Sequence, residues 1–155
     1  MAGWQLAQIN IGTMVAPKGD PVVAGFYAAL DAINAIADAS PGFVWRLQDD
    51  SGNATDLRPT ADPGLLINMS VWEDVESLAA FVYRSNHSDL MRQRRQWFQP
   101  FKGNFQALWW VPAGHRPDAM DGFARLWLLD RYGPTHQAFG FKSAFPPPVM
   151  EGAHG

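Results

Sequence analysis

The chain has 155 residues, a formal net charge of −3 and no cysteine. This length suggests one domain with a substantial core, and a weakly acidic chain offers no basic field for nucleic acid. Without cysteine, disulfides, thiolate catalysis and cysteine-ligated zinc are excluded. No apolar run approaches the roughly 20 residues of a membrane span, and the N-terminus lacks a secretory pattern. We therefore expect a cytoplasmic protein with no membrane partner.

Charged residues are scarce and aromatic residues are abundant. Asp, Glu, Lys and Arg make up 17% of the chain, which is low against the roughly 25% of an average protein. The chain also holds 7 Trp and 10 Phe. One small domain hides this much apolar surface with difficulty, so we expect it to be covered by a second copy or by an apolar ligand.

Hydrophobic periodicity predicts strand, helix and strand in the first third of the chain. Residues 4–11 alternate as a strand with one apolar and one semi-polar side. Asp20-Pro21 marks the start of a helix, and Ser40-Pro41-Gly42 ends it. Residues 43–48 alternate again and predict a second strand.

The remainder of the chain continues this pattern. A turn-rich loop leads to a strand at residues 65–72, which is followed by a helix with acidic residues in its first turn. A second helical piece is expected to end near Phe98, before a fourth strand at residues 105–111. A last helix begins at Pro117-Asp118. We expect one domain over residues 1–145 and a proline-rich tail over the last ten.

This element order predicts an α+β fold, namely a ferredoxin-like four-stranded antiparallel sheet with helices on one face. Neighbours on a strand face opposite sides, so Trp109 and Trp110 cannot enter one core. We expect the helix-free face to be the semi-polar one, which includes Gln8, Asn10, Arg46, Gln48, Asn68, Ser70 and Trp72. Packing that face on a copy of itself across a two-fold axis predicts a homodimer.

Three segments resemble a known bacterial family. They are INAIADASPGFVWRLQDDSGNAT, LLINMSVWEDVESLAAFVYRSNHSDLMRQRRQWF and LWWVPAGHRP. They are similar to DUF3291, a domain of unknown function, over roughly residues 6–141. The resemblance implies a dimeric α+β barrel, similar in architecture to antibiotic-biosynthesis monooxygenases and to IsdG-type haem-degrading monooxygenases. It implies no assigned reaction, because one fold hosts many functions.

Two histidines are candidate catalytic residues. His87 shares one face of a predicted helix with Met91 and Arg94. That face could bind a carboxylate or a carbonyl group while His87 moves a proton, or it could be a capped, solvated helix face. His115 follows the fourth strand, where loops often carry function, but it could equally hydrogen-bond the backbone of a tight junction.

Asn34 is the third candidate catalytic residue. It lies on the apolar face of the first helix, where an unpaired amide is costly, so it either binds backbone or points into a pocket between helix and sheet. The resembling architectures bind substrate in such a pocket. Its walls would be Trp72, Tyr83, Trp97 and Trp110, each of which could instead belong to the core. Arg46 and Asn68 could orient a ligand or, as buried polar groups that must be satisfied, seal the dimer.

Three functions remain open. No histidine pair has metal-ligand spacing within a helix, so no metal is predicted. The first function is a homodimer that binds a small apolar or aromatic molecule and oxidises or isomerises it without a cofactor, as the resemblance implies. The second is a non-catalytic binding or sensing module. The third is haem binding with His87 or His115 as axial ligand.

Overall fold

The computed structural model describes residues 3–17, 19–47, 65–85, 96–100 and 103–148. In chain order the elements are β1 (Trp4–Thr13), η1 (Pro21–Val23), α1 (Ala24–Asp38), β2 (Phe43–Arg46), β3 (Leu65–Trp72), α2 (Val75–Ser85), β4 (Gln106–Pro112), α4 (Ala119–Tyr132) and η2 (Phe141–Ser143). The strands form one antiparallel sheet in the order β2-β3-β1-β4. With a β-α-β-β-α-β chain order this is the ferredoxin-like arrangement, and the predicted fold class is confirmed.

Local capping signals place the helix ends. The Asp20 side chain accepts a hydrogen bond from the Val22 backbone N–H at 2.9 Å, as predicted, although one 3₁₀ turn precedes α1. α4 begins with a capping box, in which the Asp118 carboxylate accepts from the Asp121 N–H at 2.9 Å and the Asp121 carboxylate accepts from the Asp118 N–H at 3.3 Å. These bonds satisfy backbone donors that a helix leaves free in its first turn.

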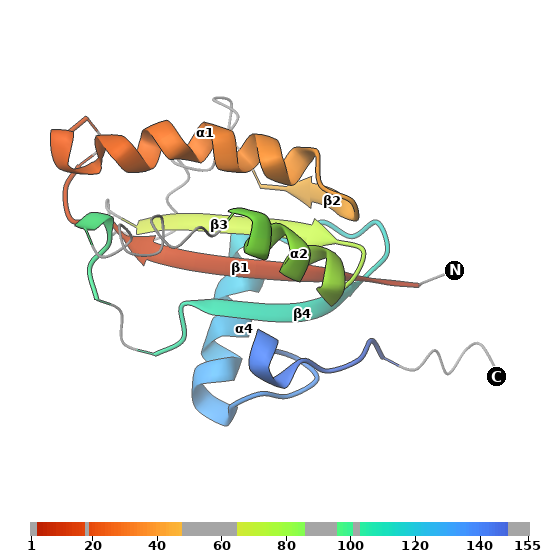
Figure 1. The fold of residues 1–155 in the computed structure, drawn as a ribbon. Helices are drawn as coiled ribbons and strands as arrows, with labels where there is room; N and C mark the ends of the chain where they lie inside the picture. The colour runs from red at the N-terminus through yellow and green to blue at the C-terminus, as the bar shows by residue number, and fades with distance from the viewer. Residues whose placement is uncertain (1–2, 18, 48–64, 86–95, 101–102, 149–155) are drawn as a thin grey trace, which may run out of the picture.

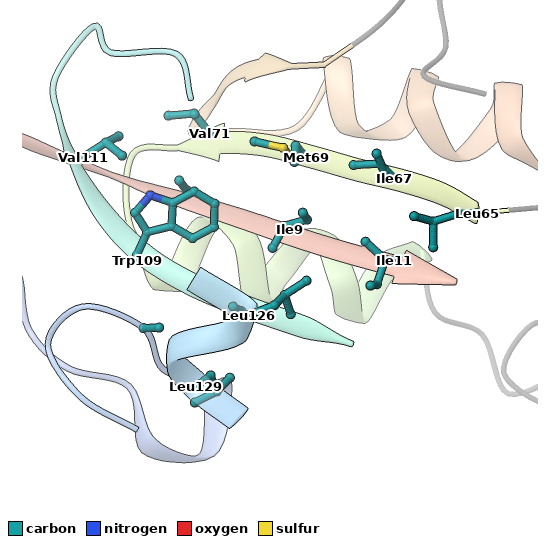
Figure 2. Close-up of a cluster of buried hydrophobic side chains, with 13 residues drawn as sticks. Ile9, Ile11, Leu65, Ile67, Met69, Val71, Trp109, Val111, Leu126 and Leu129 are labelled. Carbon is teal, nitrogen blue, oxygen red and sulfur yellow. The ribbon is translucent and has the colours of Figure 1, made fainter. Parts of the chain in front are cut away.

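Helices cover both faces of the sheet. α1 and α2 lie on one side of the sheet and α4 lies on the other (Figure 1). On the α4 side, one apolar side chain in every two along β1, β3 and β4 joins the largest hydrophobic cluster (Figure 2). Its buried members are Ala7, Ile9, Ile11, Leu65, Ile67, Met69, Val71, Ala107, Trp109, Val111, Leu126, Leu129 and Ala138. The apolar face of the sheet is thus buried within one chain.

The expectation that the semi-polar face is free of helices is wrong. Leu6 and Trp72 on that face pack in one cluster with Ala37 of α1 and Leu78 of α2. The sequence shows which face is more polar, but the choice of the face that receives two helices depends on contacts between distant segments. Because α4 covers the other face, the sheet itself gives no reason for pairing with a second copy, and the homodimer stays a prediction.

The tandem tryptophans, Trp109 and Trp110, point to opposite faces of the sheet, as predicted. Trp109 joins the cluster on the α4 side and Trp110 packs against the cluster on the α2 side. The segment after α4 then returns to the sheet edge, where the backbones of Phe139 and Leu108 exchange hydrogen bonds of 2.8 and 2.9 Å. This return covers the outer edge of β4, which would otherwise expose unpaired backbone groups.

Arg125 ties the returning segment to α4. Its Nη1 donates to the Gln137 carbonyl oxygen at 3.0 Å, and its guanidinium carbon lies 5.7 Å from the Trp109 ring centroid. Burial lowers the pKa of the Arg125 guanidinium, while the Asp121 carboxylate acts in the opposite direction. The cation is therefore used as a fixed structural donor.

Candidate functional site

Four polar side chains meet in the middle of the sheet, on the side that faces α1 and α2. Strand register places Gln8 opposite Ser70 and Asn10 opposite Asn68. Residues paired in this way across an antiparallel ladder point to the same side of the sheet. We call these four residues the polar quartet.

A continuous set of hydrogen bonds holds the polar quartet. Gln8 Nε2 donates to Asn68 Oδ1 at 2.7 Å and to Ser70 Oγ at 2.9 Å. Asn10 Nδ2 donates to Gln8 Oε1 at 3.1 Å and to Asn68 Oδ1 at 3.2 Å. Trp72 Nε1 donates to the same Ser70 Oγ at 2.8 Å. Both amide hydrogens of Gln8 and of Asn10 are thereby used inside the quartet.

Asn68 differs from the other members because its donor is available. Its Oδ1 accepts two hydrogen bonds, and turning the amide over would bring three NH₂ groups together, so its orientation is fixed. Within the described part of the chain, its Nδ2 has no hydrogen-bond partner, and the residue is exposed. This exposure is unusual because β3 is an inner strand of the sheet. Asn68 therefore presents two fixed N–H donors.

Apolar clusters flank the polar quartet on both sides along β3. Trp72, two residues beyond Ser70, belongs to the cluster with Leu6, Leu78 and Leu108. Leu66, two residues before Asn68, packs against the cluster of Met14, Val23 and Trp97. Side chains two apart on a strand share a face, so the floor beneath the helices is apolar, then polar, then apolar.

Asn34 faces this floor from α1. It is 8% exposed. On the same helix Tyr27 packs toward the cluster with Trp97, and Ala37 belongs to the cluster with Trp72. Because residues seven and three apart share a helix face, Asn34 lies on the sheet-facing side between the two clusters. Its two predicted roles, binding backbone or pointing into a pocket between helix and sheet, stay predictions.

The predicted aromatic walls fall into two separate groups. Trp72 is fully buried and stacks on Phe81 with ring centroids 5.1 Å apart. Trp97 is 6% exposed in the cluster at the other end of the quartet. Trp110 is half-buried and its Nε1 donates to the Phe145 carbonyl oxygen at 2.9 Å. Tyr83 does not fit a wall, because its side chain is 85% exposed on α2.

Arg46 has its partner within the chain. Its Nε and Nη2 donate to the two carboxylate oxygens of Asp38 at 2.8 and 3.3 Å. Such a two-pronged pair fixes geometry as well as charge. It joins the end of α1 to β2, so Arg46 is engaged here without a ligand or a second copy.

Of the two candidate catalytic histidines, the described residues include His115. His115 follows β4 and leads toward α4, with a half-exposed ring whose Nε2 lies 4.0 Å from Asp121 Oδ2. Its backbone N–H donates to the Pro112 carbonyl at 2.9 Å, and both predicted roles of the His115 side chain stay predictions. α4 and α1, the helix that carries Asn34, lie on opposite sides of the sheet (Figure 1). His87 and Arg94 lie outside the described residues.

Sequence reasoning missed Gln8, Asn10 and Ser70 as site residues. They were recognised only as part of a semi-polar face. The signal that could have found them is register, since antiparallel pairing of the two central strands puts four hydrogen-bonding side chains side by side.

A hollow of about 270 Å³ lies apart from the polar quartet and is lined by Trp4, Gln5, Glu73 and Asp74. The Asp74 carboxylate already accepts a bond of 2.7 Å from the Ser77 N–H. In the described ranges, no three His, Asp or Glu side chains gather as a metal site. The helices described there are also too short or too polar to cross a bilayer.

Comparison with known proteins places the chain in a family. The model of DUF3291, a domain of unknown function, matches residues 5–154. The chain belongs to the DUF3291 family. Among curated proteins, none matches this DUF3291 chain.

Solved structures show distant likeness to this DUF3291 protein. SnoaB, a cofactor-independent oxygenase from Streptomyces nogalater, is 15% identical, with a TM-score of 0.46 over 72% of this chain and 95% of its own. PA3566 from Pseudomonas aeruginosa is 18% identical, with a TM-score of 0.42 over 72% and 95%. A protein of unknown function from Nitrosomonas europaea is 14% identical, with a TM-score of 0.44 over 76% and 98%. Likeness at this distance carries no argument about activity.

The chemistry of the DUF3291 site follows from its own residues. The polar quartet contains two asparagines, one glutamine and one serine, none of which titrates near neutral pH. It can donate and accept hydrogen bonds, but it cannot act as a general acid or base. The arrangement is therefore suited to hold an oxygen atom, and to stabilise negative charge on it, next to apolar surface.

Proposed function

We propose that this DUF3291 protein binds a small aromatic or apolar molecule over the polar quartet. The molecule carries a carbonyl or phenolic oxygen that accepts hydrogen bonds from Asn68 Nδ2. The observation that carries this proposal is the exposed, fixed amide of Asn68 on an inner strand. A donor whose orientation is already fixed loses little entropy when a ligand binds.

The flanks of the quartet account for the apolar part of the ligand. Leu66 on one side and Trp72 on the other belong to hydrophobic clusters, and ligand sites combine apolar lining with a few placed polar groups. Asn34 is buried on the sheet-facing side of α1, above the same floor. Asn10 Oδ1, which lacks a partner among the described residues, could accept from a ligand hydroxyl.

For the reaction, we propose oxygenation by dioxygen without a cofactor. A methylene carbon next to the bound oxygen loses a proton to solvent water, and the resulting enolate is stabilised by the Asn68 donors. The carbanion then reduces dioxygen, and the overall conversion is CH₂ plus O₂ to C=O plus H₂O. Because the quartet has no base, the substrate must ionise readily, as a methylene group between aromatic rings or carbonyl groups does.

Ligand titration tests the binding step. Phenols and aromatic ketones with an activated methylene group are screened by tryptophan fluorescence and calorimetry against the native chain, Asn68→Ala and Asn68→Asp. Loss of a charge-assisted bond costs about 1.5–3 kcal/mol, so we expect Asn68→Ala to weaken binding at least about tenfold. Asn68→Asp should weaken it further, because a carboxylate repels a phenolate.

The control is Asn104→Ala, which removes an exposed asparagine bonded to Asp130 on the other side of the sheet from α1. It should leave the dissociation constant unchanged. Equal binding by the native chain and by both Asn68 variants would exclude the quartet as the site. Oxygen uptake, measured with an electrode on the ligand that binds best, distinguishes an oxygenase from a sensing module. Binding without oxygen uptake would exclude the oxygenase and support the sensing module.

A further inference from the structure

The outward surface of α4 carries an exposed stripe that the proposed ligand site does not use. Met120 is 65% exposed and Trp127 is 56% exposed. Ala124 and Arg131 are also exposed, and the four residues are spaced by four, three and four positions. That spacing puts them on one line along a helix. We call them the α4 stripe.

The C-terminal end of the α4 stripe is already organised. The Arg131 guanidinium carbon lies 5.6 Å from the Trp127 ring centroid and 5.7 Å from that of Tyr132. Trp127 and Tyr132 meet edge to face at 6.2 Å, and Tyr132 is 62% exposed. Trp, Tyr and Arg are the residues that most often dominate binding at protein interfaces. Large exposed apolar side chains gathered on one helix mark an interaction surface.

We propose that the α4 stripe is the surface by which two copies of this chain pair, with their α4 helices antiparallel across a two-fold axis. An isologous pair of this kind, centred between residues 125 and 126, sets Trp127 of each copy against Ala124 of the other. A large side chain then packs over a small one, as knobs pack into holes between helices. Met120 of each copy meets the aliphatic part of Arg131.

Charges on the flank of the stripe agree with the antiparallel direction. In an antiparallel helix pair like flanks meet, so Arg131 and Tyr132 of one copy approach the first turn of the other. Asp121 lies in that turn with its carboxylate 48% exposed. The pairing therefore brings a cation to a carboxylate at each end. A parallel pair would instead place Arg131 beside Arg131 and Trp127 beside Trp127.

The length of α4 limits the strength of this pairing. Its 14 residues span about 21 Å at 1.5 Å per residue. One helix pair of this length buries less than the roughly 1,600 Å² of a standard interface, so we expect dissociation constants in the micromolar range.

Sedimentation equilibrium of the full chain tests the proposal. We expect the native chain to convert from monomer to dimer between about 1 and 200 μM. Trp127→Lys should weaken the dimer at least about 30-fold, because it removes the central aromatic anchor. Ala124→Glu should do the same by filling the space that receives Trp127. Both positions are exposed, and far-UV circular dichroism verifies that the variants fold.

Val22→Lys is the matched control. Val22 is 57% exposed, which is similar to the 56% of Trp127, but it lies in η1 and not on α4. It should leave the dimer unchanged. A native chain that is monomeric at about 200 μM would overturn the proposal. A dimer that survives both Trp127→Lys and Ala124→Glu would overturn it as well.

Cross-linking tests the antiparallel direction, and the lack of native cysteine makes single introduced cysteines specific. Across the two-fold axis, two copies of Ala124→Cys lie about 5 Å apart along the helix axes and two copies of Met120→Cys about 16 Å apart. A thiol cross-linker of about 8 Å should therefore join Ala124→Cys dimers and leave Met120→Cys uncoupled. Efficient cross-linking at Met120→Cys would overturn the antiparallel register.

Discussion

Ser70 separates the structural role of the polar quartet from its proposed binding role. Its Oγ accepts from Gln8 Nε2 and from Trp72 Nε1, and Ser70, Gln8 and Trp72 are all buried. Asn68 also accepts two bonds, but it is exposed. Water can replace an acceptor at an exposed position and cannot easily do so at a buried one.

Ser70→Ala should therefore destabilise the fold more than Asn68→Ala. Two buried donors without an acceptor cost about 2–4 kcal/mol together, whereas the loss at Asn68 should stay below about 1 kcal/mol. Urea unfolding followed by circular dichroism measures both. Equal losses of stability in the two variants would show that the Ser70 acceptor is not a buried junction of the quartet.

At the scale of elements, the turn between α1 and β2 is held against the start of α2. Gly42 has a φ of 82°, and a Cβ at this position would clash with the Ser77 side chain. The Gly42 carbonyl also accepts from the Glu73 N–H at 2.8 Å. The turn therefore requires glycine at this one position for two reasons, namely the backbone conformation and the close approach of the Ser77 side chain.

Gly114 separates these two requirements. Its φ of 89° is similar, but a Cβ there would meet no atom within 4 Å. Gly114→Ala should cost about 1–2 kcal/mol for the left-handed backbone alone, and Gly42→Ala should cost about 1–3 kcal/mol more because of overpacking. Chemical denaturation of both variants gives the difference. Identical losses would mean that Ser77 moves aside and that α2 is not held by this turn.

Sequence reasoning succeeded for these elements where the signal is local. The caps at Asp20 and Asp118 and the stop at Ser40-Pro41-Gly42 were found because each depends on residues a few positions apart. The side of the sheet that α1 and α2 cover was assigned wrongly, since alternation gives two faces but not the layer above each. Asn68 was recognised for its residue type, while its partners depend on register between β1 and β3.

At the scale of the whole molecule, the surplus of apolar residues is distributed differently from the expectation. Composition predicts apolar surface that needs cover, and strand alternation predicts that the uncovered surface is one face of the sheet. Instead α4 covers the sheet, and large apolar side chains remain exposed on the outer surface of α4 at Met120, Trp127 and Tyr132. Composition can indicate how much apolar surface a chain has, but only the packing of elements shows where it remains.

The segment after α4 is an integral part of the fold, because it covers the sheet edge beside Trp110. Phe139 is fully buried and its ring centroid lies 5.7 Å from that of Phe145. Phe139→Ala should cost about 3–5 kcal/mol, the usual loss for a buried phenylalanine. Phe145→Ala should cost less, because its ring is half-buried and the backbone carbonyl that accepts from Trp110 Nε1 is kept. Urea unfolding monitored by tryptophan fluorescence measures both changes. If Phe139→Ala proved as mild as Phe145→Ala, the segment would be a loosely attached extension and the core would end with α4.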